Sequence, residues 1–316
     1  MEHRKHHYVP QCYLRNFSKD GKSLNTWDKK RSKEYAAAIN NVCMHKDLYK
    51  IDTQLNEEAK KVDSLYLETE FFSKFVEQEY SKLLSRIIDC KKKNKQVDFT
   101  DNEKYKFACY MAIQWYRLPD MKDDIHNVKI ETARFEIELM KSYLADTKGG
   151  DSFNKLKIEP ISDPAVDHAQ VYADEEIVND FANILYQDYW TFFYIDTPQI
   201  WTSDFPMTVN PHVNGTPELY NGFGMYGAEI DFPISKDIVL VMWDSRYFKD
   251  RIEDDMKFIH LDAKGVRRYN MMKYLYAKEK VFSFSDDFSL IKFFLSTNKG
   301  NEVFMNGSPR TQISHG

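Results

Sequence analysis

A long stretch without helix-breaking residues sets the main constraint on the fold. From about residue 56 to residue 92 the chain contains neither proline nor glycine. Large apolar residues recur within it at the spacing of one helix face, and they are Phe72, Val76, Tyr80, Leu83, Leu84 and Ile87. A long amphipathic helix is therefore expected, and its apolar face needs a partner layer to cover it.

The opposite face of this helix carries Glu70 and Glu77. Seven residues make two turns of an α-helix, so these carboxylates would stack on one side. Two such groups can hold a divalent cation or shift each other's pKa, and the alternative is a solvated face. A basic run, Lys91 to Lys95, follows at the helix end. Its charges either complement the helix dipole or face phosphate.

A second helix is predicted to start after Thr100, because the sequence Thr-Asp-Asn-Glu fits a capping box. It is expected to run to residue 118, where Pro119 ends it, and it is apolar on most sides. Gln114 and Arg117 share one of its faces. We expect Arg117 either to bind phosphate or carboxylate or to pair with a structural carboxylate such as Glu70.

The remaining patterns extend this picture. The first fifty residues suggest short extended pieces, and His168 is expected at the surface near the start of a helix. Further helices are predicted at 122–145, 167–189 and 258–278, with strands at 190–195, 200–201, 229–233, 238–243 and 281–283.

The predicted fold class is α+β. A central helical bundle (residues 56–190) packs against an antiparallel sheet (within 191–306), and a short, extended, β-rich segment (1–55) precedes them. A single domain over residues 1–306 is expected, with a disordered tail at 307–316.

Composition excludes some classes of function. The chain has 316 residues and a net charge of -5, so its overall charge does not favour binding to nucleic acid. No apolar run of about 18 residues occurs, and we expect neither a membrane span nor a signal peptide. The four cysteines have no CxxC spacing. They are typical of reduced thiols in a cytoplasmic protein, and a structural zinc site is not expected.

Three histidines stand close together near the start of the sequence, and they are His3, His6 and His7. Pro10 biases the residue before it towards extended backbone, so this segment is predicted to be a strand or stiff arm. Successive side chains of an extended segment point to opposite sides, so at most one of His6 and His7 enters a given site. Neutral imidazole suits metal binding and proton transfer. The alternative is an exposed polar arm or a tag.

A second conspicuous stretch is Thr202-Ser203-Asp204-Phe205-Pro206. Asp204 follows a predicted strand beside small hydroxyls that can hold a carboxylate in place. On the residues alone, an Asx turn that folds the chain back is the favoured interpretation. Asn270, in the last predicted helix, either orients a ligand or bonds backbone.

Several of these motifs resemble one known family. His6-His7-Tyr8-Val9-Pro10-Gln11, then Tyr13 to Phe17, is similar to the signature of the DUF4238 family, which was described without an assigned function. The Thr-Ser-Asp-x-Pro stretch, the pattern of Gln114, Arg117 and Pro119, and Val281-Phe282-Ser283 resemble later parts of it. The resemblance spans His6 to about Ser283. It implies acidic positions that match Glu70 and Glu77, and it makes Asp204 the best single acidic site residue.

These residues lead to two functional hypotheses. The first is a metal-assisted hydrolase of phosphate esters, preferably a nuclease acting on nucleic acid. His6, Glu70, Glu77 and Asp204 would bind Mg²⁺, Mn²⁺ or Zn²⁺. His6 or His7 would act as base, and Gln114 and Arg117 would complete the site. The second is a non-catalytic protein that binds or senses a ligand or nucleic acid, with the same residues forming a structural polar network. The sequence does not indicate an oligomeric state.

Overall fold

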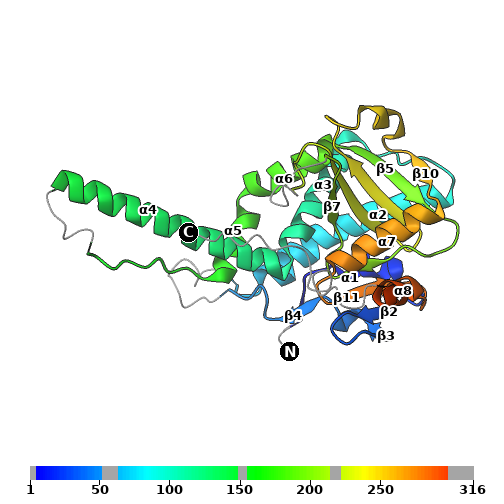
Figure 1. Ribbon diagram of the computed structural model, residues 1–316, viewed down its shortest axis with the longest axis horizontal. Coiled ribbons are helices and arrows are strands. Elements are labelled where there is room, and N and C mark those ends of the chain that lie inside the picture. The colour runs from blue at the N-terminus through cyan, green and yellow to red at the C-terminus, as the bar shows by residue number, and fades with distance from the viewer. Residues whose placement is uncertain (1–4, 52–62, 149–154, 214–221, 298–316) are drawn as a thin grey trace.

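The computed structural model describes residues 5–51, 63–148, 155–213 and 222–297. The predicted disordered tail and the predicted helix start between residues 56 and 62 lie outside these ranges. The structure combines several helices with antiparallel and mixed sheets, so the predicted α+β fold class is confirmed (Figure 1). Within the described ranges, no helix is long and apolar enough to cross a membrane.

The N-terminal segment is built from short strands. β1 (Lys5–His7) pairs antiparallel with β4 (Met44–Lys46), and β2 (Ser23–Asp28) pairs with β3 (Lys33–Ala38). Between them lie the short helix α1 (Gln11–Leu14) and a 3₁₀ turn. Two strands from late in the chain, β6 (Thr202–Ser203) and β11 (Lys280–Ser283), join β2 and β3 in the order β3-β2-β11-β6. The N-terminal segment is thereby tied to the C-terminal part.

The helical part starts with a π-helix, η4 (Leu67–Val76), which continues into α2 (Glu77–Lys92). The capping box at Thr100 is confirmed at the start of α3 (Asp101–Tyr116). Pro119 does not simply end that helix, because it also begins α4 (Pro119–Lys148). The helix predicted at 167–189 is divided into α5 (Pro164–Ala173) and α6 (Glu175–Gln187), where Asp174 caps the second piece.

The C-terminal part is organised around a five-stranded sheet. Its order is β10-β5-β9-β8-β7, formed by β5 (Tyr189–Tyr194), β7 (Thr208–Pro211), β8 (Ala228–Ser235), β9 (Ile238–Trp243) and β10 (Phe258–His260). All pairs are antiparallel except β10 with β5. The prediction of one helix over 258–278 is wrong at its start, since β10 comes first and Asp262 then caps α7 (Ala263–Tyr276).

The sheet lies between two helical layers. The ring of Phe107 on α3 contacts Trp190 on one face of the sheet. Tyr269 on α7 contacts Phe193 on the other. One hydrophobic cluster runs through the N-terminal segment, the helical part and the sheet, and a smaller one joins Trp27 and Trp201 to α8 (Ser289–Thr297). The predicted packing of helices on a sheet follows from this shared core.

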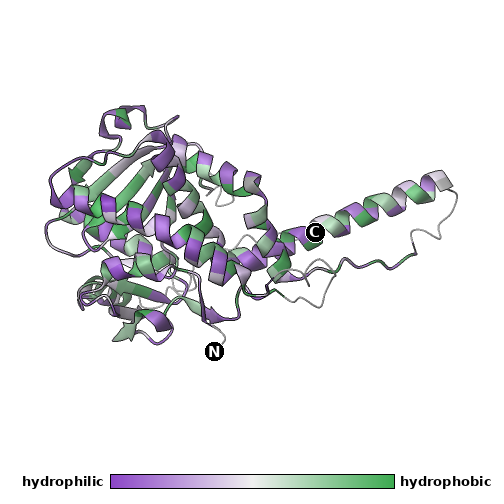
Figure 2. Cartoon of the chain, turned by 180° about the vertical axis from the view of Figure 1, so that it is seen from behind, coloured by the Kyte–Doolittle hydropathy of each residue, from purple (hydrophilic) through white to green (hydrophobic). Residues whose placement is uncertain are grey.

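The C-terminal half of α4 projects from the rest of the structure (Figure 1). Figure 2 shows that it carries hydrophobic as well as hydrophilic residues along its length. Phe135 is 70% exposed and Tyr143 is 66% exposed. This projection is distant from the residues that the sequence singles out.

Candidate functional site

The N-terminal arm (residues 5–10) presents its two histidines to different surroundings. His6 is buried, and its Nδ1 accepts a hydrogen bond from the backbone N–H of Tyr49 at 3.0 Å. The two rings stack with a centroid separation of 5.8 Å. His7 lies beside Arg117, and burial, followed by the Arg117 charge, lowers the pKa of its imidazole. The predicted extended arm is confirmed by the pairing of β1 with β4.

Arg117 is the centre of this junction. Its side chain is 1% exposed, and Nη1 donates to Glu77 Oε1 at 2.9 Å. Nη2 donates to the backbone carbonyl of His7, and the guanidinium carbon lies 4.2 Å from the ring centre of Phe72. Arg117 therefore joins the arm, the start of α2 and the end of α3. Its structural partner is Glu77 rather than the suggested Glu70.

Glu70 lies outside this cluster because of the π-helix. In η4 the backbone N–H of Glu77 reaches the carbonyl of Phe72, five residues earlier. This winding is wider than an α-helix, so seven residues no longer complete two turns and the two glutamates do not stack. Glu70 instead pairs with Lys74 at 2.7 Å, and the two side chains are 40% and 58% exposed.

Glu68, rather than Glu70, is the second carboxylate that lies close to Arg117. Burial raises its pKa to about 7, against the opposing charge of Arg117, and the charge of Glu77 raises it further. The backbone N–H of His7 also donates to this carboxylate. One of its oxygens, Oε2, is buried without a hydrogen-bond partner in the described residues, as is Nε of Arg117. An α-helical period does not single out Glu68, so its role was missed.

Gln114 lies on the buried side of the same helix as Arg117. Its Oε1 accepts a hydrogen bond from the hydroxyl of Tyr80 at 2.7 Å. Tyr49, the stacking partner of His6, donates its hydroxyl to the carbonyl of Arg117, also at 2.7 Å. These hydrogen bonds between uncharged groups hold the end of α3 against α2 and the N-terminal segment.

His168 is not at the surface as predicted. It is 0% exposed, and its Nε2 lies 2.5 Å from the carbonyl oxygen of Tyr116 and 3.0 Å from the hydroxyl of Tyr172. Burial lowers its pKa to about 4, so the ring is neutral at pH 7. Its ring also stacks on Tyr49 at 5.6 Å. The residue belongs to the packing behind the Arg117 cluster.

The Asp204 carboxylate accepts hydrogen bonds from three backbone N–H groups. Its Oδ1 accepts from the N–H of Lys278 at 2.9 Å, and Oδ2 accepts from those of Glu279 at 2.7 Å and Lys280 at 2.9 Å. Burial raises its pKa to about 6, although these three bonds act in the opposite direction. The carboxylate thus holds the loop that leads into β11. Asp204 therefore does not form the local Asx turn that the residues alone favoured, because the N–H groups that it binds lie far along the chain.

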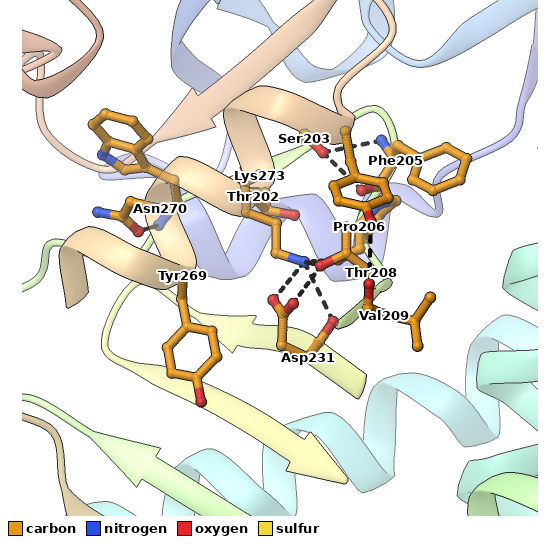
Figure 3. A network of polar contacts seen from close by, with 12 residues as sticks. Thr202, Ser203, Phe205, Pro206, Thr208, Val209, Asp231, Tyr269, Asn270 and Lys273 are labelled. Carbon is orange, nitrogen blue, oxygen red and sulfur yellow. Dashed lines mark hydrogen bonds and ion pairs between the residues drawn. The ribbon is translucent and has the colours of Figure 1, made fainter. Parts of the chain in front are cut away.

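At the Thr-Ser-Asp-x-Pro stretch, α7 contacts Pro206 and the residues that come just before the stretch (Figure 3). Lys273 is completely buried, and its Nζ lies 2.6 Å from Asp231 Oδ1 and donates to the carbonyl of Pro206 at 2.6 Å. Asn270 accepts from the backbone N–H of Trp201 and donates to the carbonyl of Gln199, so it bonds backbone. These contacts lock the turn between β6 and β7 onto the sheet.

The basic run after α2 is partly neutralised. Lys91 lies 3.5 Å from Asp237, and Lys92 lies 3.5 Å from Asp89. These acidic neighbours therefore reduce the charge that the run offers to a phosphate chain.

The four residues expected to bind a metal have four different partners. His6 faces Tyr49 and Glu70 faces Lys74. Glu77 pairs with Arg117, and Asp204 faces the loop before β11. In the parts of the chain that the structure describes, no three His, Cys, Asp or Glu side chains form a group that can hold a metal ion. What the structure brings together is His7, Glu68, Glu77 and Arg117. This set can exchange a proton near neutral pH beside a fixed positive charge.

Comparison with known proteins gives a family without an activity. The model of a family described as "Protein of unknown function (DUF4238)" matches residues 5–287. No curated protein and no solved structure matches the chain. The matched region runs from the arm past β11 and includes every residue of the Arg117 cluster. The chain therefore belongs to the DUF4238 family.

Proposed function

We propose that this protein is a non-catalytic binding or sensing protein in which the histidine and carboxylate motifs form a structural polar network. The observation that carries the proposal is the buried Arg117 guanidinium, which joins Glu77 to the carbonyl of His7. A buried arginine of this kind specifies one arrangement of the segments that it joins, because any other leaves a charge unpaired.

The atoms expected to bind a metal already have hydrogen-bond partners within the protein, and this supports the same function. The Nδ1 of His6, the carboxylate of Asp204 and one oxygen of Glu77 each have an internal partner. A catalytic metal centre needs ligands that converge with open coordination positions. These three residues, and Glu70 with Lys74, are instead engaged in four separate contacts.

A small polar ligand is the molecule that the cluster would recognise. Arg117 Nε offers a donor and Glu68 Oε2 offers an acceptor, both without a partner in the described residues. Buried polar groups in native proteins are normally hydrogen-bonded, so a molecule with an acceptor beside a donor would complete this pair. Movement of the arm would admit it, and the arm's position would then report the ligand. We place this function in the cytoplasm, since the four cysteines are free thiols in the structure.

A metal-assisted phosphate-ester hydrolase, in particular a nuclease, is the second candidate. It is favoured by one observation, the two carboxylates of Glu68 and Glu77 lying next to the Arg117 charge. In that function these carboxylates would hold Mg²⁺, Mn²⁺ or Zn²⁺, and Arg117 would stabilise charge on a phosphate of a nucleic acid. Such an ion supplies Lewis acidity when bound.

Calorimetric titration with MgCl₂, MnCl₂ and ZnCl₂ separates the two candidates. Wild type, Glu77→Gln and the control Glu70→Gln are compared, alongside cleavage assays on RNA, single-stranded DNA and duplex DNA. The binding function predicts no cleavage by any of the three proteins. Cleavage and metal binding that Glu77→Gln abolishes and Glu70→Gln preserves would overturn it in favour of the hydrolase.

A further inference from the structure

An aromatic pocket lies on the helical part, where α3 packs against α6. Its volume is about 390 Å³, and four aromatic side chains line it. These are Trp115, Tyr116, Phe181 and Phe223. The pocket is open to solvent, and its volume accommodates a small organic molecule.

The rings meet one another at steep angles. Trp115 and Phe223 have centroids 4.6 Å apart with planes at 80°, and Tyr116 and Phe181 are 5.8 Å apart, also at 80°. Phe181 and Phe223 complete the set at 4.9 Å and 48°. Rings in such edge contacts turn their faces in different directions. Phe181 is almost fully buried, so Trp115, Tyr116 and Phe223 are the rings that a guest can contact.

One carboxylate also lines this pocket. Asp180 is exposed on α6, and within the described ranges it has neither an ion pair nor a hydrogen bond through its side chain. Its charge, after burial, raises the pKa of the Tyr116 hydroxyl, which places the two groups near each other. The lining contains no lysine, arginine or histidine. The pocket consequently combines π faces with a single negative charge.

We propose that this pocket binds a small organic cation of the quaternary ammonium class. A cation over an aromatic face is attracted by the ring quadrupole, and the attraction increases when water is excluded. Asp180 adds a favourable charge for a cation and repels an anion. A neutral apolar molecule of the same shape would gain contact with the rings but nothing from the charge.

The pocket is distinct from the Arg117 cluster. Trp115 and Tyr116 face it from α3, whereas Gln114 and Arg117 point to Tyr80 and Glu77. The proposal therefore does not depend on the function assigned to the cluster, and failure of one leaves the other standing.

Calorimetric titration with tetramethylammonium and choline chlorides tests this inference, with 3,3-dimethylbutan-1-ol as the uncharged counterpart of choline. Wild type is expected to bind both cations, and to bind the alcohol at least about fivefold more weakly than choline. Asp180→Asn is expected to weaken choline binding by about three- to tenfold, and Phe223→Leu by a similar factor. Glu176→Gln, on the same helix but outside the pocket, should leave binding unchanged.

Asp180 and Glu176 are both exposed, so neither substitution should affect folding, and melting curves verify this. Absence of binding by either cation would overturn the proposal. Equal affinity for choline and the alcohol would do so too, because the pocket would then select shape without charge. So would an Asp180→Asn variant that binds choline as well as wild type does.

Discussion

Arg117 and Glu77 form an ion pair of 2.9 Å in which the guanidinium is 1% exposed and the carboxylate 26%. The pair links the end of α3 to the first residue of α2, and the same arginine donates to the His7 carbonyl in the N-terminal arm. Such a partly buried pair adds little net stability compared with apolar residues of the same size, but breaking it is costly. Its value lies in fixing one arrangement of three segments.

Substitution of Arg117 by Met should therefore be strongly destabilising. The variant leaves the His7 carbonyl and the Glu77 carboxylate without their donor, and we expect a loss of about 3 kcal/mol in the free energy of unfolding. Urea denaturation followed by circular dichroism measures this loss.

The double variant Arg117→Met/Glu77→Gln removes both charges, so it should recover part of that stability. Glu70→Gln is the matched control, with an expected effect within about 0.5 kcal/mol, because its ion pair with Lys74 is exposed. A loss below about 1 kcal/mol in Arg117→Met would contradict the role given to this residue.

Glu68 should make stability depend on pH around neutrality. Its carboxyl keeps its proton in the folded protein up to a pKa of about 7. In the unfolded chain a glutamate loses it near about 4.3. Raising the pH between these values therefore favours unfolding, because the unfolded state binds fewer protons. Glutamine does not titrate, so the Glu68→Gln variant does not share this loss. Its free energy of unfolding relative to wild type should therefore rise from pH 5 to pH 7.5. Urea midpoints at several pH values provide the measurement, and a constant difference would argue against a buried Glu68.

Local signals account for the elements that the sequence predicted well. The capping box at Thr100 depends on a few neighbouring residues, and the structure contains it. The two faces of β1 likewise follow from an extended backbone. These features need no knowledge of distant parts of the chain.

The cluster around Arg117 could be predicted only in part, because it depends on packing between distant segments. The π winding of η4 directs Glu68 rather than Glu70 to the cluster, and nothing in the α-helical period indicates it. Lys273 gives no local sign of burial, since its partner Asp231 comes from a strand far along the chain. The available signal was on that strand, where Asp231 stands between the buried Ile230 and Phe232.

His168 should remain neutral well into the acid range. Its burial lowers the pKa to about 4, whereas a histidine in the unfolded chain titrates near about 6.5. The stability that neutral His168 contributes is therefore fully present above about pH 6.5, and it is lost as the pH falls towards about 4. NMR of the imidazole nitrogens, with His168→Phe to assign the signal, gives the titration directly. A midpoint near 6.5 in the folded protein would place the ring in solvent and contradict the structure.

Asp204→Asn distinguishes a structural from a metal-binding carboxylate. Asparagine keeps one acceptor, but its amide group would face the N–H groups of Glu279 and Lys280, which now bond to Oδ2. A buried N–H left without an acceptor costs about 1–3 kcal/mol. Removing a charge whose burial raises the pKa to about 6 offsets part of this cost. We expect the free energy of unfolding to fall by about 1 kcal/mol at pH 7.5, which is the lower limit of that cost.

Hydrogen exchange localises the effect of this substitution. The backbone amides of residues 278–280 should exchange faster in Asp204→Asn, while those of β9 in the centre of the sheet should not, because the lost acceptors serve that loop alone. A metal-binding Asp204 predicts the reverse: unchanged amide exchange at 278–280 and a loss of Mg²⁺, Mn²⁺ or Zn²⁺ affinity in the calorimeter. Unchanged exchange together with such a loss would return Asp204 to a catalytic site, since the carboxylate would then act on a ligand rather than on the backbone of its own chain.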